Sequence, residues 1–395
     1  MNALLIRNVQ AVDPGHRVFP ADILVRDGLI ETVAAAGSLR ASGADEVEGA
    51  GRLLTPGLID VHTHGILKVV YESGPRALAE AAAALGRFGV TTVVPTLVPR
   101  DLGPGARERF LADLRALVEA IPSVRGVHIP GLHLEGPFMA VAGAACATLD
   151  GNLPLLEEIV DACRNRLAVM SVSPETRGIL PVIRRLRELG VAVFFTHTRA
   201  GPEATVAAID AGATHATHFY DVFYAPTETD PGVRPVGAVE AALADPRATV
   251  DFIADGIHVH PMAIRAALAA KSWRGVSLIT DSNIGAGLPD GLYDTPWGYR
   301  VRVSPDTAAR HSVNGTLAGS ALTMNRGIAN LLRWLDLPPE QVWAMGTLNP
   351  ARLLGLERKG RIQPGADADL VLWRDDLHPA FTWLAGQLTH EDSSF

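Results

Sequence analysis

The chain has 395 residues, 48% of them hydrophobic, and a formal net charge of −8 at pH 7. This apolar content excludes an intrinsically disordered protein, and the acidic balance argues against nucleic acid as a partner, because phosphate binding needs clustered Lys and Arg. At this length we expect one large domain together with a smaller one.

The sequence has the features of a cytoplasmic protein. Two cysteines, Cys146 and Cys163, are too few for a disulfide framework, which fits a reducing compartment. Residues 1–8 lack the basic and then apolar layout of a signal peptide, and no segment reaches the roughly 18 uninterrupted apolar residues of a membrane span. We therefore expect a soluble cytoplasmic protein with no membrane partner.

Both ends of the chain have the pattern of short β-strands. Within the apolar run 22–30, the Asp27-Gly28 pair predicts a tight hairpin, because Gly accepts the positive φ that such a turn requires. Near the other end, residues 368–373 form a similar apolar run. We predict one small β-sandwich domain built from residues 1–55 and 356–395.

Between the two ends, short apolar strands alternate with longer helical stretches that are rich in Ala and Leu. The predicted strands cover residues 58–61, 90–98, 126–134, 167–172, 191–196, 213–217, 249–254 and 275–280. Alternation of this kind indicates a parallel sheet, and eight units predict a closed (β/α)8 barrel over residues 56–355. The alternative is a doubly wound open sheet, but no glycine-rich dinucleotide motif follows the first strand.

Polar residues stand at the carboxyl ends of these strands, where barrels of this type carry their active sites. In chain order they are His62 and His64, Glu135, His197, His218, the segment from Asp255 to His258, and Asp281. A lone histidine at a strand end usually has a structural role, and we expect that role for His133, His215 and His260. The recurrence at strand after strand instead favours one shared site.

The residue types at these strand ends predict a metal centre. His62 and His64 face the same way on a strand of period two, so their imidazoles can chelate one ion. Neutral imidazoles with a carboxylate suit zinc or a related divalent metal, which would activate a water molecule. Asp281 is the candidate general base and acid, and His258 is placed to bind a substrate carbonyl or hydroxyl. This chemistry predicts hydrolysis of an amide or a related bond.

The motifs together resemble those of the N-acetylglucosamine-6-phosphate deacetylase family in the amidohydrolase superfamily. Residues 56–65 read Pro-Gly-Leu-Ile-Asp-Val-His-Thr-His-Gly and residues 133–138 read His-Leu-Glu-Gly-Pro-Phe. Residues 255–258 read Asp-Gly-Ile-His, Thr280-Asp281 follows, and residues 315–320 read Gly-Thr-Leu-Ala-Gly-Ser. The resemblance covers nearly the whole chain.

The resemblance implies a role for each matching residue. Glu135, His197 and His218 would hold the main metal ion, His62 and His64 a second one where it is present, and Asp281 would be the catalytic acid and base. The residues that would bind the substrate are Asp221, Val222, Asp255, Gly256, His258, Thr316, Leu317, Ala318 and Gly319. The small-molecule substrate would be an N-acylated amino sugar, and the family implies a homodimer.

The chain departs from the family pattern next to the metal motifs. Members usually have Lys-Gly-x-His after the Glu motif, where residues 142–145 read Ala-Gly-Ala-Ala. The usual Asn-Ala after the second metal histidine is replaced by Asp221-Val222. Members also have Arg-Glu-Pro-Gly, whose arginine binds the sugar phosphate, but residues 229–232 of this chain read Thr-Asp-Pro-Gly. We therefore expect poor handling of the phosphosugar, with Arg199 or Arg234 as replacement anion ligands.

Three hypotheses follow from the sequence. The first is a metal-dependent deacylase acting on an amino sugar or a related small N-acyl compound. The second is a hydrolase of another amide, such as a cyclic amide, but no strand-end Lys is present that could bridge two metals. The third is a non-catalytic scaffold, which predicts lost ligands, and none of the candidate ligands is lost.

Overall fold

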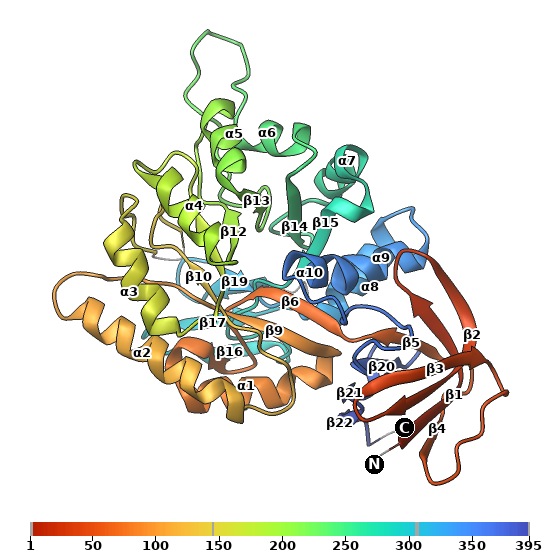
Figure 1. Cartoon of the computed structure of the whole chain (residues 1–395). Helices are drawn as coiled ribbons and strands as arrows, with labels where there is room; N and C mark the ends of the chain where they lie inside the picture. The colour runs from red at the N-terminus through yellow and green to blue at the C-terminus, as the bar shows by residue number, and fades with distance from the viewer. Residues whose placement is uncertain (1–2, 144–145, 305–307, 394–395) are drawn as a thin grey trace.

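The computed structural model of the chain describes residues 3–143, 146–304 and 308–393. Ala144 and Ala145, which belong to the segment that departs from the family pattern, lie outside these ranges. A central barrel-like body occupies most of the molecule, and a separate sheet that contains both ends of the chain lies beside it (Figure 1). The barrel is the part that positions the candidate site.

Eight parallel strands form the barrel, which confirms the predicted fold class. They are β6 (Leu58–Thr63), β9 (Val90–Leu97), β10 (Leu132–Glu135), β11 (Leu167–Val172), β12 (Ala192–Phe195), β13 (Ala213–Ala216), β14 (Thr249–Ile253) and β15 (Val276–Ile279). Beyond the last strand the ring closes, because Asp281 N donates to His62 O at 2.9 Å and His64 N donates to Ser282 O at 2.8 Å. The first and last strands therefore meet at their carboxyl ends.

Helices pack around the barrel, most of them between its strands and the last three after its final strand (Figure 1). They are α1 (Pro75–Leu85), α2 (Ala106–Ala120), α3 (Leu153–Cys163), α4 (Ile179–Glu188), α5 (Pro202–Ala211), α6 (Ala238–Ala244), α7 (Pro261–Lys271), α8 (Met324–Trp334), α9 (Pro339–Gly346) and α10 (Leu348–Leu353). The amphipathic α4 shows why they form, since Ile179, Val182, Ile183 and Leu186 repeat at helical spacing and all are buried. None of the helices in the described part of the chain is long and apolar enough to cross a membrane.

The sheet beside the barrel combines strands from both ends of the chain. It contains β1 (Ala3–Asp13), β2 (Arg17–Arg26), β3 (Leu29–Ala35), β4 (Asp45–Glu48), β5 (Leu53–Pro56), β20 (Leu370–Trp373), β21 (Pro379–Leu384) and β22 (Gln387–Glu391). Strand β5 pairs with β1 on one side and with β20 on the other. The predicted hairpin is present, with φ of 51° at Asp27 and 80° at Gly28. The domain boundaries at residues 55 and 356 stay predictions.

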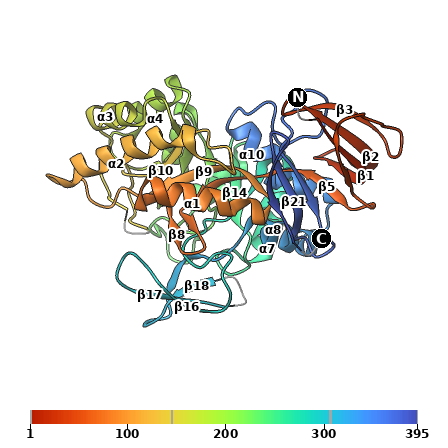
Figure 2. The ribbon, with the colours of Figure 1, turned by 90° about the horizontal axis from the view of Figure 1, so that it is seen from below.

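A third sheet follows the last barrel strand and was not expected from the sequence. It contains β16 (Gly291–Asp294), β17 (Arg300–Val303), β18 (Ala308–His311) and β19 (Leu317–Ser320), all antiparallel. Figure 2 shows it projecting from one face of the barrel, close to β8 (Val69–Val70). Val301 packs there against Val70 and Ile284. This sheet supplies one wall of the cavity described below.

Candidate metal centre

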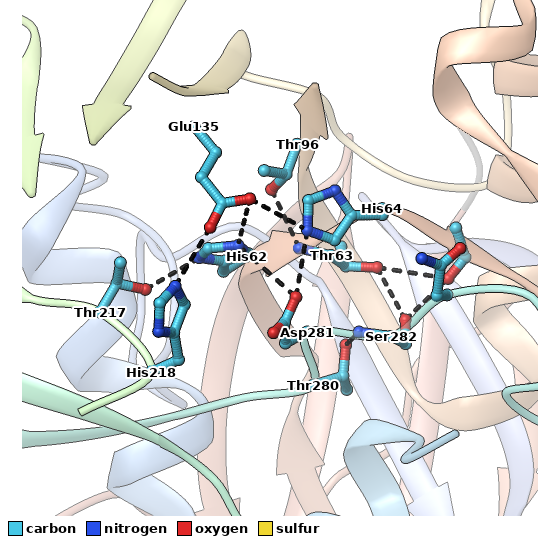
Figure 3. A network of polar contacts seen from close by, with 12 residues as sticks. His62, Thr63, His64, Thr96, Glu135, Thr217, His218, Thr280, Asp281 and Ser282 are labelled. Carbon is cyan, nitrogen blue, oxygen red and sulfur yellow. Dashed lines mark hydrogen bonds and ion pairs between the residues drawn. The ribbon is translucent and has the colours of Figure 1, made fainter. Parts of the chain in front are cut away.

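The six predicted metal and catalytic residues lie at the carboxyl ends of barrel strands, on one side of the barrel. Glu135 ends β10, and His62 lies within β6 with His64 immediately after that strand. His197, His218 and Asp281 each follow their strand by two residues, after β12, β13 and β15. Figure 3 shows five of them, His62, His64, Glu135, His218 and Asp281, converging on a common centre.

Glu135 is the carboxylate that joins the two histidine sets. Its Oε1 atom lies 3.0 Å from His197 Nε2 and 3.1 Å from His218 Nε2. Its Oε2 atom lies 3.4 Å from His64 Nε2 and 3.8 Å from His62 Nε2. One oxygen therefore faces each set.

Asp281 closes the other side of the first histidine pair. Its Oδ1 atom lies 3.1 Å from His64 Nε2 and 3.6 Å from His62 Nε2. Two groups of potential ligand atoms, each within 4.8 Å of one another, result: His62, His64 and Asp281, and His62, Glu135 and His218. His62 belongs to both groups, so the arrangement can hold one or two ions, whereas the predicted ligand His197 belongs to neither group.

Unsatisfied polar atoms show that this site fits a divalent metal. His62 Nε2 and Glu135 Oε2 are buried and have no hydrogen-bond partner among the described residues. His62 Nδ1 contacts the Thr217 hydroxyl at 2.9 Å, which leaves Nε2 for the centre of the site. Buried polar groups are rarely left without a partner, and imidazole with carboxylate is a donor set that suits zinc. A cation between these atoms would satisfy them.

The electrostatics of the site favour ionised carboxylates. Burial opposes the ionisation of Glu135, but hydrogen bonds from His197 and His218 outweigh it and hold the pKa of Glu135 well below its usual range. Burial likewise opposes the ionisation of Asp281, but the nearby His62 and His64 lower its pKa to about 2. Both groups are therefore negatively charged at neutral pH, as cation binding requires.

Three of the six residues adopt a backbone conformation that is unusual for residues other than glycine. The φ angles of His197, His218 and Asp281 are 49°, 38° and 46°. Such left-handed residues cost on the order of 1–3 kcal/mol and concentrate at functional sites. Specific hydrogen bonds hold the two histidines: Asp251 Oδ1 accepts from His218 N at 2.5 Å, and the Ser173 hydroxyl donates to His197 O at 2.7 Å.

The three histidines that were expected to be structural make contacts of that kind. His133 is buried in the barrel between Val61 O at 3.0 Å and the Ser171 hydroxyl at 2.7 Å. His215 Nε2 contacts Asp251 Oδ2 at 2.8 Å. His260 precedes α7, where its side chain accepts a hydrogen bond from the N–H of Met262.

A cavity of about 540 Å³ opens above the metal centre. Its walls include Glu135, His64, His197, His218 and Asp281, together with the predicted substrate residues Asp221, Val222, His258, Leu317, Ala318 and Gly319. His258 Nδ1 contacts Asp255 Oδ2 at 2.6 Å, so the other ring nitrogen is left for a ligand. The structure thus brings most of the predicted substrate residues into one cavity with the candidate metal ligands.

Four predicted substrate residues are not among the described residues that line this cavity: Arg199, Asp255, Gly256 and Thr316. Asp255 lies behind His258 and orients it. Gly256 lies next to the ring of Trp334, and Thr316 bonds to Asn314 in an exposed turn. The guanidinium of Arg199 instead lies 4.2 Å from the centroid of the Tyr224 ring.

Sequence reasoning missed four residues that line the cavity: Arg100, Asn283, Trp297 and Tyr299. Arg100 follows strand β9, and its position near a barrel strand end was a signal that could have identified it. Asn283 likewise comes shortly after β15. Trp297 and Tyr299 reach the cavity from the unexpected sheet, and no local pattern marks them.

The chain is similar to known proteins over most of its length. Residues 53–389 match the model of the amidohydrolase family. N-acetylglucosamine-6-phosphate deacetylase of Vibrio furnissii is 34% identical over 86% of this chain and 83% of its own length. N-acetylgalactosamine-6-phosphate deacetylase of Escherichia coli O157:H7 is 32% identical over 86% and 89%. The crystal structure of N-acetyl-D-glucosamine-6-phosphate deacetylase from Mycobacterium smegmatis is 28% identical, with a TM-score of 0.83 over 98% of this chain and all of that one.

Proposed function

Because this chain belongs to the amidohydrolase family, we propose that it is a metal-dependent deacetylase that hydrolyses the N-acetyl amide of an amino sugar. The family and the deacetylase relatives support a hydrolytic enzyme that acts on an amide. The observation that carries the proposal is the position of Glu135, with two imidazoles beside each of its carboxylate oxygens at the floor of a cavity.

The proposed metal ligands are Glu135, His197 and His218 for the main ion, and His62 and His64 for a second. Nitrogen and oxygen ligands of this kind suit Zn²⁺, although related divalent metals use them too. When bound, such an ion would polarise the amide carbonyl and promote ionisation of the attacking water. The orphaned atoms of His62 and Glu135 support a cation at this centre, and the division of the ligands between two ions follows the family resemblance.

Asp281 is the proposed general base and general acid. Its carboxylate is ionised, because its pKa is lowered to about 2 against the effect of burial by His62 and His64, and it lines the cavity. It can accept a proton from the water that attacks the carbonyl carbon. The same carboxyl group then gives that proton to the amide nitrogen as the C–N bond breaks, which yields acetate and the free amine.

His258 is the proposed ligand of the substrate on the neighbouring wall. Its Nδ1 is held by Asp255 at 2.6 Å, so its Nε2 is available for the amide carbonyl or a sugar hydroxyl. Asp255 therefore acts through His258 and fixes the orientation of its ring.

We also propose a cytoplasmic location and a homodimer. The two cysteines are free and buried, which suits a reducing compartment. The dimer rests on the family resemblance, and gel filtration with light scattering would test it.

The test of the proposed function is a screen of the zinc-loaded enzyme against N-acetyl amino sugars and N-acetyl amino acids, each with and without a phosphate where one can be attached. We expect release of acetate from at least one amino sugar. Turnover confined to N-acetyl amino acids or to cyclic amides would reject the amino sugar assignment while leaving the metal site intact.

A further inference from the structure

We propose that Arg100, held in place by Glu72 and Trp297, determines the specificity of this cavity and selects an N-acetyl amino sugar that carries no phosphate. This inference rests on the proposed function and names the substrate class of the same site. None of these three residues belongs to the candidate metal centre, and they come from segments far apart in the chain.

The three residues form one hydrogen-bonded unit at the cavity wall. Glu72, in the short helix η1 (Tyr71–Ser73), accepts on its Oε1 from Arg100 Nη1 at 2.6 Å and from Trp297 Nε1 at 2.9 Å. The Arg100 guanidinium also lies 5.3 Å from the centroid of the Trp297 ring. Arg100 and Trp297 line the cavity, whereas Glu72 stands behind them.

Aromatic stacking behind Trp297 makes this wall rigid. The Trp297 and Tyr299 rings stack with centroids 5.8 Å apart, and Tyr299 stacks on His311 at 4.8 Å. His311 belongs to β18, so the stack connects the cavity wall to the small antiparallel sheet. A guanidinium that is fixed from two sides loses little conformational entropy when it binds a ligand, which favours recognition of a polar group at this point.

The charges around Arg100 favour a neutral ligand over a dianion. Arg100 is the only Lys or Arg among the described residues that line the cavity, and the Glu72 carboxylate balances its charge. Asp221 adds a further carboxylate to the same walls. Apart from the metal centre, a phosphate dianion would therefore meet Arg100, whose charge Glu72 already balances, and Asp221, which would repel it.

The same groups match the hydroxyls of an uncharged sugar. A guanidinium only donates hydrogen bonds and an ionised carboxylate only accepts them, whereas a hydroxyl does both. Arg100 can therefore donate to one ring hydroxyl while Asp221 accepts from another. Among the described residues, the Asp221 carboxylate accepts no hydrogen bond, so it is available to a ligand.

The arginines that the sequence offered as anion ligands do not provide the missing clamp. Arg199 lies over Tyr224 and does not line the described cavity walls. Arg234 pairs with Glu240 at 2.5 Å, with 81% of its side chain exposed. Arg100 is thus the cationic side chain that is placed to bind the sugar.

The experiment measures kcat and KM of the zinc-loaded enzyme with N-acetylglucosamine, N-acetylgalactosamine and their 6-phosphates, for the wild type and for Arg100→Met, Arg100→Lys and Glu72→Gln. Arg185→Met is the matched control, because Arg185 pairs with Glu157 at 2.7 Å on the outer surface with a similar exposed fraction. Circular dichroism and thermal melting show that each variant is folded, and the Arg100→Lys variant keeps the charge if Arg100→Met does not fold.

We expect wild-type kcat/KM to be higher for at least one unphosphorylated sugar than for its 6-phosphate. Arg100→Met should raise the KM of that sugar about 10- to 100-fold, the scale of a lost hydrogen bond to a charged group, with a smaller change in kcat. Glu72→Gln, which leaves Arg100 uncompensated, should reduce the discrimination against phosphate. Arg185→Met should change neither the KM of the sugar nor the discrimination against phosphate.

Two results would overturn the inference while the proposed function stands. One is an unchanged KM in Arg100→Met. The other is a wild-type preference for the 6-phosphates, and if Arg100→Met abolished that preference, Arg100 would be a phosphate ligand. A wild-type enzyme that deacetylates none of the four sugars but hydrolyses another amide would overturn the proposed function, and this inference with it.

Discussion

The Nδ1 atom of His62 lies 2.9 Å from the hydroxyl of Thr217, the residue that immediately precedes His218. A candidate ligand from the first barrel strand is thus oriented by the neighbour of a candidate ligand from the sixth. Contacts of this kind fix which ring nitrogen faces a metal, and their loss typically lowers metal affinity 10- to 100-fold.

Thr217→Val should therefore weaken zinc binding about 10- to 100-fold while leaving the fold intact. The side chain keeps its size, but the hydroxyl that holds His62 is lost. Competition with a fluorescent chelator would measure the affinity, and Thr227→Val, at an exposed position, is the control. Equal zinc affinities in the two variants would show that Thr217 has no part in positioning His62.

Metal removal should abolish hydrolysis and lower the thermal stability. Each chain should carry between one and two divalent ions, which would be measured by plasma mass spectrometry of the purified protein. Because an ion that binds only the folded state stabilises that state, zinc should restore both the activity and the melting temperature. A metal-free preparation with full activity would contradict the proposed chemistry.

Asp281→Asn should lower kcat by a factor on the order of 10² to 10⁴, the usual scale for a general acid or base. An amide cannot accept the proton that the carboxylate takes. The kinetics should be measured on protein whose zinc content matches that of the wild type. Asp294→Asn is the control, since 93% of the Asp294 side chain is exposed, and near-normal turnover of Asp281→Asn would remove Asp281 from its assigned role.

His215→Ala should destabilise the fold by about 3 kcal/mol or more, because it leaves the buried Asp251 carboxylate without its imidazole partner. The backbone of His218 should also become more mobile, because its N–H donates to Asp251 Oδ1 at 2.5 Å. Urea unfolding would measure the free energy of unfolding, with the exposed His378→Ala as control. A change of less than 1 kcal/mol would show that Asp251 finds another partner.

The barrel was predictable because its strands and helices are local patterns. All eight predicted strands are present, and helices lie between them along the chain as the alternation predicts. The third strand begins at Leu132 instead of residue 126, since Pro130 and Gly131 interrupt the run.

The cavity wall was not predictable in the same way. Strands β16 to β19 are only four residues long each, and the region between them is rich in Gly, Pro and Asp, so it has the composition of a loop. Trp297 becomes a cavity residue only because that sheet folds back toward Arg100 and Glu72. Tertiary contacts of this kind leave no periodic trace in the sequence.

The pairing of β5 with β20 has a consequence for the synthesis of the protein. Strand β5 ends one residue before β6, the strand that carries His62, yet its partner on one side consists of residues 370–373. While the ribosome is still making the barrel, this edge of β5 stays open. Strand β5 is therefore paired on both sides only when nearly the whole chain has emerged. A ribosome that stalls before residue 370 would release a chain with an exposed strand edge, a feature that promotes aggregation.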